Sequence, residues 1–144
     1  MIHLLDVNVI IALCDPAHPH HSSARGHFVT GLTRDGWATC PLVENGFLRI
    51  FGARSYPGGP GSPEVARTVL DRLQHAGGHQ SWPDEVSLMD SHRFPFLPSS
   101  KHLTDLYLLG LAVKRGGCLA TFDSGIDASL VPGGTAAYRL IPAG

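Results

Sequence analysis

The sequence predicts an α/β fold in which helices flank a central, mostly parallel twisted sheet. Short apolar runs of strand length alternate with longer segments of helical periodicity along the chain. The 144 residues are 43% hydrophobic, which is enough for one domain to bury a core. Since neither an internal repeat nor a hinge-like linker interrupts the alternation, we expect residues 1–144 to form a single domain.

The elements of the first half follow from apolar runs bounded by turn residues. A buried strand over residues 2–5 leads into an apolar helix over 8–14, which ends before Asp15-Pro16. A polar loop rich in histidine then spans residues 17–22. After it we expect a helix over 22–34, a turn at Asp35-Gly36, a strand over 37–40 and a helix over 42–51. Strands separated by helices indicate parallel pairing, because parallel neighbours need long crossover connections.

The second half begins with irregular structure at residues 52–63, where prolines and glycines crowd together. Ser62-Pro63-Glu64 is typical of a helix N-terminus, and this helix should end at Gly77-Gly78. The rest of the chain predicts a short strand within 82–88, an irregular stretch over 89–100, a long helix over 103–115, and strands over 118–122 and 138–141.

Four acidic residues, Asp6, Glu44, Asp105 and Asp123, stand in apolar stretches. Carboxylates are rarely buried without a partner, because removing an isolated ion from water costs several kcal/mol or more. No matching set of cations accompanies them in these stretches. The pattern therefore indicates a divalent metal ion.

The expected fold brings these acids to one edge of the sheet. Asp6 and Asp123 each close a strand, Asp105 lies in the first turn of its helix, and Glu44 lies in the first turns of the helix after the second strand. Open parallel sheets bind ligands at the carboxyl ends of their strands. Mg²⁺ or Mn²⁺ would offset the repulsion among the acids, and an open acidic site of this kind suits hydrolysis of a phosphodiester.

Composition limits the partners and the location. The net charge of −1 leaves no overall basic footprint, so a nucleic acid would have to be held by a local patch or by metal ions. The three cysteines are widely separated and form no metal or redox motif, so we interpret them as reduced core thiols. Without a secretory leader or a long apolar span, we expect a soluble, cytoplasmic protein and no membrane association.

The segments that carry the acids resemble the PIN domain, and within it the VapC toxins of bacterial toxin-antitoxin systems. The matching pieces are residues 4–13 around Asp6, the apolar helix with Glu44, residues 103–112 around Asp105, and residues 117–123 ending at Asp123. Many relatives place a short polar residue before the last acid, where this chain has Phe122. The fourth acidic position therefore depends on Asp123 alone.

The resemblance implies an endoribonuclease that depends on Mg²⁺ or Mn²⁺ and acts as the toxin of a type II system. It further implies a homodimer, and neutralisation by a cognate antitoxin whose tail lies across the acidic groove. Carried over by position, Asp6, Asp105 and Asp123 would be metal ligands, and Glu44 would help bind metal or orient the attacking water. Asn8 and Thr104 match polar neighbours that support these ligands.

Other interpretations of the same features stay open or are disfavoured. A PIN fold that binds RNA or a protein partner without cleavage is the main alternative. A phosphatase of the haloacid dehalogenase type needs a second aspartate two residues after the first, and this chain has Asn8 there. His18, His20 and His21 match no established zinc spacing, so we interpret them as a surface or substrate-facing loop.

Overall fold

The computed structural model describes the backbone of residues 1–143 and their side chains except those of residues 31–33. It contains a parallel five-stranded sheet in the order β3-β2-β1-β4-β5. The strands are β1 (His3–Leu5), β2 (Trp37–Thr39), β3 (His79–Ser81), β4 (Cys118–Thr121) and β5 (Tyr138–Leu140). Every pairing is parallel, for example His3 with Trp37 and with Cys118, so the predicted α/β class with a parallel sheet is confirmed.

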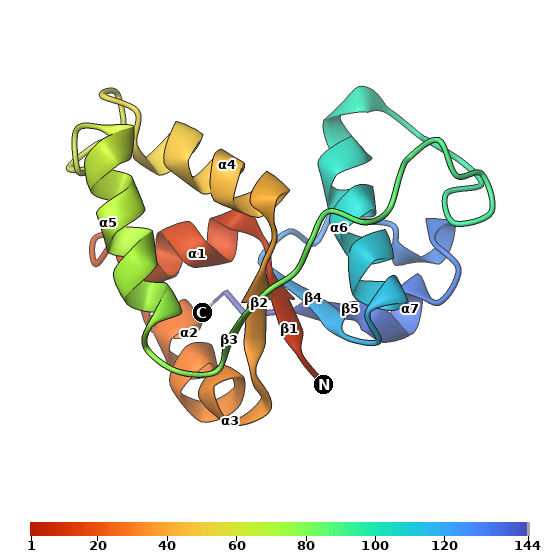
Figure 1. Ribbon diagram of the computed structural model, residues 1–144, viewed down its shortest axis with the longest axis horizontal. Helices are drawn as coiled ribbons and strands as arrows, with labels where there is room; N and C mark the ends of the chain where they lie inside the picture. The colour runs from red at the N-terminus through yellow and green to blue at the C-terminus, as the bar shows by residue number, and fades with distance from the viewer. Residues whose placement is uncertain (144) are drawn as a thin grey trace.

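Helices cover both faces of the sheet (Figure 1). One side carries α1 (Val7–Cys14), α2 (His21–His27), α4 (Pro41–Phe51) and α5 (Pro63–Gln74), and the other carries α6 (Leu103–Lys114) and the short α7 (Gly134–Ala137). The chain order reverses at β1, where β2 and β4 lie on either side. In a doubly wound sheet this switch point is where ligands bind.

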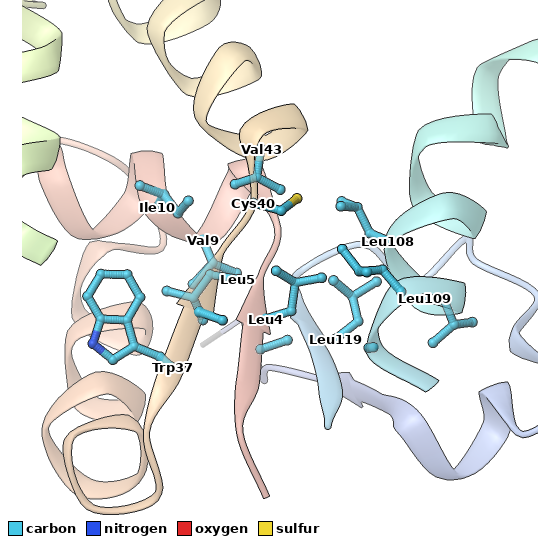
Figure 2. Packing of buried hydrophobic residues seen from close by; sticks show 14 of the residues in the cluster. Leu4, Leu5, Val9, Ile10, Trp37, Cys40, Val43, Leu108, Leu109 and Leu119 are labelled. Carbon is cyan, nitrogen blue, oxygen red and sulfur yellow. The ribbon is translucent and has the colours of Figure 1, made fainter. Parts of the chain in front are cut away.

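The core forms where the central strands meet helices on both sides (Figure 2). Leu4, Leu5 and Leu119 are fully buried, as are Val9 of α1 and Leu109 of α6. The central strands are apolar on both faces because helices cover both, which is the usual pattern of buried parallel strands.

Close approach of α4 to α1 depends on a glycine. A Cβ at Gly46 would lie 2.8 Å from Cγ2 of Val7, well inside van der Waals contact. The absent side chain thus lets the helix that carries Glu44 lie directly against the helix that follows Asp6.

The start of α4 is capped from a distant segment. Its N-cap residue Cys40 makes no side-chain capping bond, and Oδ2 of Asp84 instead accepts a hydrogen bond of 3.0 Å from the backbone N–H of Leu42. By contrast α5 begins as its sequence predicts, with Ser62 Oγ accepting from the Val65 N–H at 3.2 Å and Pro63 at the first helical position.

The structure corrects two expected elements. The predicted helix over 22–34 is divided into α2, a π-helical turn over Phe28–Leu32 and α3 (Thr33–Asp35). The strand expected within 82–88 is instead β3 at His79–Ser81. Positive φ values at Gly77 and Gly78 turn the chain onto β2, and an edge strand exposes enough surface to be polar.

The three cysteines are free thiols, of which Cys40 and Cys118 are buried as expected and Cys14 is half-buried. Burial raises the pKa of Cys14 and of Cys40 to about 12. Within the part of the chain that the structure describes, no helix has the length and apolar character needed to cross a membrane.

Candidate active site

Asp6 lies at the point where β1 passes into α1. It is the N-cap of α1, and its Oδ1 accepts a hydrogen bond of 2.7 Å from the Val7 N–H. Only 6% of the residue is exposed. Burial raises the pKa of Asp6, the hydrogen bonds from Thr121 and Val7 oppose that shift, and the charge of Asp123 adds to it. Asp6 thus caps α1, but capping a helix does not by itself require a carboxylate to be so deeply buried.

Thr121 joins Asp6 to the end of β4. Its hydroxyl donates a hydrogen bond of 2.7 Å to Oδ2 of Asp6 and accepts one of 3.0 Å from the backbone N–H of Asp123. Asn8 approaches the same hydroxyl with Nδ2 at 3.4 Å, while its Oδ1 accepts from the Phe122 N–H at 3.3 Å. The ends of β1 and β4 are therefore held together by side chains as well as by the sheet.

Asp105 and Asp123 complete an acidic cluster with Asp6. Burial first, and then the charges of Asp6 and Asp123, raise the pKa of Asp105 to about 7; a side-chain hydrogen bond with Asp123 contributes further. Asp105 belongs to the first turn of α6, and Asp123 follows β4, where its Oδ1 accepts from the Gly125 N–H at 2.7 Å. We call Asp6, Asp105 and Asp123 the aspartate cluster.

Tyr138 is a neighbour of this cluster that sequence reasoning missed. Its hydroxyl donates a hydrogen bond to the backbone oxygen of Asp123. Burial, followed by the charges of Asp123, Asp105 and Asp6, raises the pKa of Tyr138. Thr121 was also missed as a site residue, although a threonine two positions before an acid at a strand end was a usable signal.

Glu44 is held by one residue of β2 and one residue of α5. Its Oε2 accepts hydrogen bonds of 2.8 Å from Thr39 Oγ1 and 2.8 Å from Gln74 Nε2. Thr39 Oγ1 is in turn 2.8 Å from Nε2 of His79. The charge of Asp123 acts on the pKa of Asp6, and the charges of Asp6 and Asp123 act on that of Asp105, whereas Glu44 is not among the charges acting on either group. Three of the four expected acids therefore interact electrostatically with one another. The fourth, Glu44, forms a separate hydrogen-bond network.

The two residues expected to support the site, Asn8 and Thr104, differ in their contacts and exposure. Asn8 bonds to Thr121 and Phe122 as described, whereas Thr104 is exposed in the first turn of α6. Asp127 is the other acid that follows β4 and could occupy the last acidic position of the site in place of Asp123. It caps the 3-10 turn Ala128–Leu130 by accepting from the Ser129 N–H at 3.1 Å.

The histidine loop lies against the end of β4. The ring of His20 stacks on Phe122 with centroids 4.9 Å apart, and Nδ1 of His18 accepts from the His20 N–H at 3.0 Å. Nδ1 of His21 lies 2.7 Å from the carbonyl oxygen of Ala12. Phe122, which stands where many relatives have a short polar residue, therefore holds this loop next to Asp123 through its contact with His20.

The aspartate cluster fits a divalent cation held in the manner of Mg²⁺. Among the described residues, none of the ion pairs to Lys, Arg or His involves Asp6, Glu44, Asp105 or Asp123. Nor do three or more His, Cys, Asp or Glu side chains in residues 1–143 form a ready metal cage. Mg²⁺ usually binds through one or two carboxylates and keeps several waters, so a complete protein cage is not required. Burial is the main cause of the raised pKa of Asp105, and repulsion from Asp6 and Asp123 adds to it; a bound cation would relieve that repulsion.

Comparison of the fold with solved structures gives a match to the crystal structure of VapBC2 from Rickettsia felis bound to a DNA fragment from its promoter. The TM-score is 0.57, the sequences are 12% identical, and the match covers 85% of this chain and 89% of that one. At this identity the similarity concerns the fold alone. No protein-family model matches the chain.

Curated relatives extend the match to the sequence. Ribonuclease VapC44 of Mycobacterium tuberculosis is 42% identical over 134 residues, which is 92% of this chain and 93% of the relative. Ribonucleases VapC38 and VapC39 of the same species are 43% and 39% identical, over 85% and 92% of this chain. The fold and the aspartate cluster define a PIN-domain protein of the toxin-antitoxin class. The chain belongs to the VapC ribonuclease family, and the resemblance predicted from the sequence is confirmed.

Proposed function

We propose that this chain is a Mg²⁺- or Mn²⁺-dependent endoribonuclease that hydrolyses RNA phosphodiester bonds as the toxin of a type II toxin-antitoxin system. Its relatives named as ribonucleases align with nearly the whole chain. The observation that carries the proposal is the convergence of acids at the switch point of the sheet, where Thr121 donates to the buried Asp6 at 2.7 Å and accepts from the Asp123 N–H at 3.0 Å. Burial, and then the charges of Asp6 and Asp123, raise the pKa of Asp105 to about 7, an environment that suits a cation.

Asp6, Asp105 and Asp123 would hold the metal ion. When bound, the ion would lower the pKa of a water molecule and stabilise charge on the leaving oxygen. Thr121 and the Val7 N–H fix both oxygens of Asp6, which keeps that carboxylate in one orientation. The Tyr138 hydroxyl holds the backbone of Asp123, and Asn8 ties the same strand end to α1.

Glu44 has a separate part in the proposal. Thr39 and Gln74 hold its Oε2, so Oε1 is the oxygen available to orient the attacking water or to contact the metal ion. Its position in the first turn of α4, just after β2, supports a role at the same edge of the sheet as the aspartates. Asn8 and Thr104 would support the site, Asn8 through the bonds described and Thr104 from the exposed side of α6.

The partners follow from the family. The matched solved structure is VapBC2 from Rickettsia felis bound to promoter DNA, and this match supports a cognate antitoxin as the partner of this chain. An antitoxin tail that lies over the acidic edge would shield the aspartate cluster from RNA. We further propose that residues 1–144 act as one domain, that two copies form a homodimer, and that the protein works in the cytoplasm, where its RNA substrate is found.

Cleavage of a single-stranded RNA pool tests this function. We expect cleavage with Mg²⁺ or Mn²⁺, loss of cleavage with a chelator, and loss with Asp6→Asn or Asp105→Asn. Asp71→Asn is the matched control, because Asp71 is exposed on α5 and its ion pair among the described residues is with His75. Circular dichroism should show the same fold in all variants. RNA that binds to the wild type but is never cut would favour the non-cleaving module instead.

A further inference from the structure

We propose that a cavity beside Asp105 is a subsite for one nucleobase of the RNA, and that it selects the nucleotide next to the cut bond. This inference depends on the proposed ribonuclease function and specifies its substrate. The cavity has a volume of about 280 Å³. Its lining includes Phe96, His102, Asp105, Ile126, Asp127 and Leu130.

The cavity shares a wall with the aspartate cluster. Asp105 belongs to both, and the chain from Asp123 continues directly into Gly125, Ile126 and Asp127, which also line the cavity. A nucleotide whose phosphate lies at the aspartate cluster would therefore have its base close to the cavity. A bound base would in turn hold the phosphate in place, which is how remote contacts contribute to catalysis.

Apolar and aromatic side chains provide surfaces for the faces of a base. Ile126 and Leu130 form one part of the wall, and Phe96 contributes an aromatic ring that remains 57% exposed. Phe96 is not needed as an anchor of its segment, because Phe94 is buried against Gly110 of α6. Proteins that read single-stranded RNA commonly stack unpaired bases on such exposed aromatic rings.

Polar groups in the wall provide an edge that can distinguish bases. Oδ1 of Asp127 accepts both hydrogen bonds from Ser129, and among the described residues its Oδ2 accepts none. Nδ1 of His102 is buried and has no hydrogen-bond partner within the described part of the chain. A carboxylate accepts hydrogen bonds from exocyclic amines. We therefore expect adenine, cytosine or guanine to be preferred over uracil.

The size of the cavity favours a single base over a larger occupant. Ligand sites in proteins begin at roughly 300 Å³, and the 280 Å³ here is close to that lower end. A partner helix would need a long groove, whereas this cavity of about 280 Å³ is lined by Asp105 and Leu106 of α6 and by Asp127 and Leu130 around the 3-10 turn. A single side chain of a protein partner is the competing occupant, and the experiment must separate the two.

Methyl-detected NMR of the full chain tests the subsite without cleavage. Ile126 and Leu130 report on the cavity, and the probes are the four ribonucleoside 5′-monophosphates, which contain no internucleotide bond. We expect AMP, CMP and GMP to shift these methyl signals more than UMP, and Phe96→Ala to weaken the response about tenfold. Met89→Ala is the matched control, because Met89 is 90% exposed in the same segment and does not line the cavity.

Cleavage mapping adds a second measurement. Phe96→Ala should lower kcat/KM about tenfold, and Asp127→Asn should reduce the preference against uracil at one position beside the cut. Nucleotides that leave both methyl signals unchanged would overturn the subsite, even if the protein cleaves RNA. Signals that move only with a basic peptide would assign the cavity to a protein partner and would also overturn it. Selective nucleotide shifts in a protein that cuts no RNA would support the subsite while the ribonuclease proposal fails.

Discussion

The hydroxyl of Thr121 donates a hydrogen bond of 2.7 Å to Oδ2 of Asp6, across a separation of 115 residues in the chain. Both residues are buried, with Thr121 fully so. The bond joins the ends of β1 and β4, which are the two strands nearest the aspartate cluster. Among the described residues, Thr121 is the donor to Oδ2 of Asp6, and the Val7 N–H is the donor to Oδ1.

Replacing Thr121 tests this relationship directly. Thr121→Val keeps the shape but leaves a buried carboxylate oxygen without its donor, so we expect the free energy of unfolding to fall by about 1–3 kcal/mol. The pKa of Asp6 should also rise, because the bond from Thr121 lowers it. Thr121→Ser keeps the hydroxyl and should recover most of the loss. Equal urea midpoints for the Val and Ser variants would contradict the assignment.

The stability of the metal-free protein should depend on pH through Asp105. Its folded pKa of about 7 lies above the ordinary value, so the folded state binds the proton more tightly than the unfolded state. The stabilisation is therefore present below pH 4 and is lost as the pH rises through 7. We expect a decline of about 1–2 kcal/mol, because the carboxyl is only half-buried and solvent screens the shift.

Chemical unfolding at a series of pH values in a chelating buffer measures this decline. Asp105→Asn should flatten the curve between pH 4 and pH 7, since the variant has no carboxyl to titrate. Added Mg²⁺ should raise stability most at the high end of that range, because it binds the folded, ionised site. Because His3, His27 and His79 have lowered pKa values and also titrate in this range, the wild type is compared with the variant at each pH. Wild-type and Asp105→Asn curves that run parallel from pH 4 to pH 8 would show that the pKa of Asp105 is not raised.

Gln74 should affect cleavage only through Glu44. Gln74→Leu removes one of the two donors to Oε2, so we expect a loss of about 0.5–1.5 kcal/mol in stability and a measurable fall in cleavage. In a double-mutant cycle with Glu44→Gln, the effects of the two changes should be less than additive. Independent, additive effects on cleavage would remove Gln74 as a positioning residue.

Asp84 should stabilise the helix that carries Glu44. Asp84→Ala leaves the Leu42 N–H without its acceptor, and loss of an N-cap of this kind costs about 1 kcal/mol. Asp71→Ala on α5 is a matched control, since an exposed pair with His75 contributes little. Thermal unfolding compares the two variants, and a control that loses as much stability as Asp84→Ala would argue against the cap.

Much of the architecture was predictable from short patterns. The runs around Leu4 and Leu119 are apolar because helices cover both faces of the strands, and that burial is visible in composition alone. The edge strand β3 was not predictable in the same way. His79–Ser81 are polar and partly exposed, and they form a strand because Gly77 and Gly78 bring their backbone onto β2.

The candidate site likewise contains residues that the sequence predicted and residues that it did not. Asp6, Asp105 and Asp123 stood out because acids in apolar sequence need a physical explanation. Tyr138 gave no such signal, since a tyrosine in a strand is ordinary. Its relation to Asp123 arises only because β4 and β5 pair in parallel, with Leu119 opposite Tyr138.

The sequence by itself determined the alternation of strands and helices and marked the acids, because burial pattern and charge are properties of local composition. Only the tertiary structure decided which acids share a site. The charge of Asp123 raises the pKa of Asp6, and the charges of Asp6 and Asp123 raise that of Asp105, whereas Thr39 and Gln74 hold Glu44. Such interactions depend on strand order and helix packing, which bring together residues more than 100 positions apart in the chain.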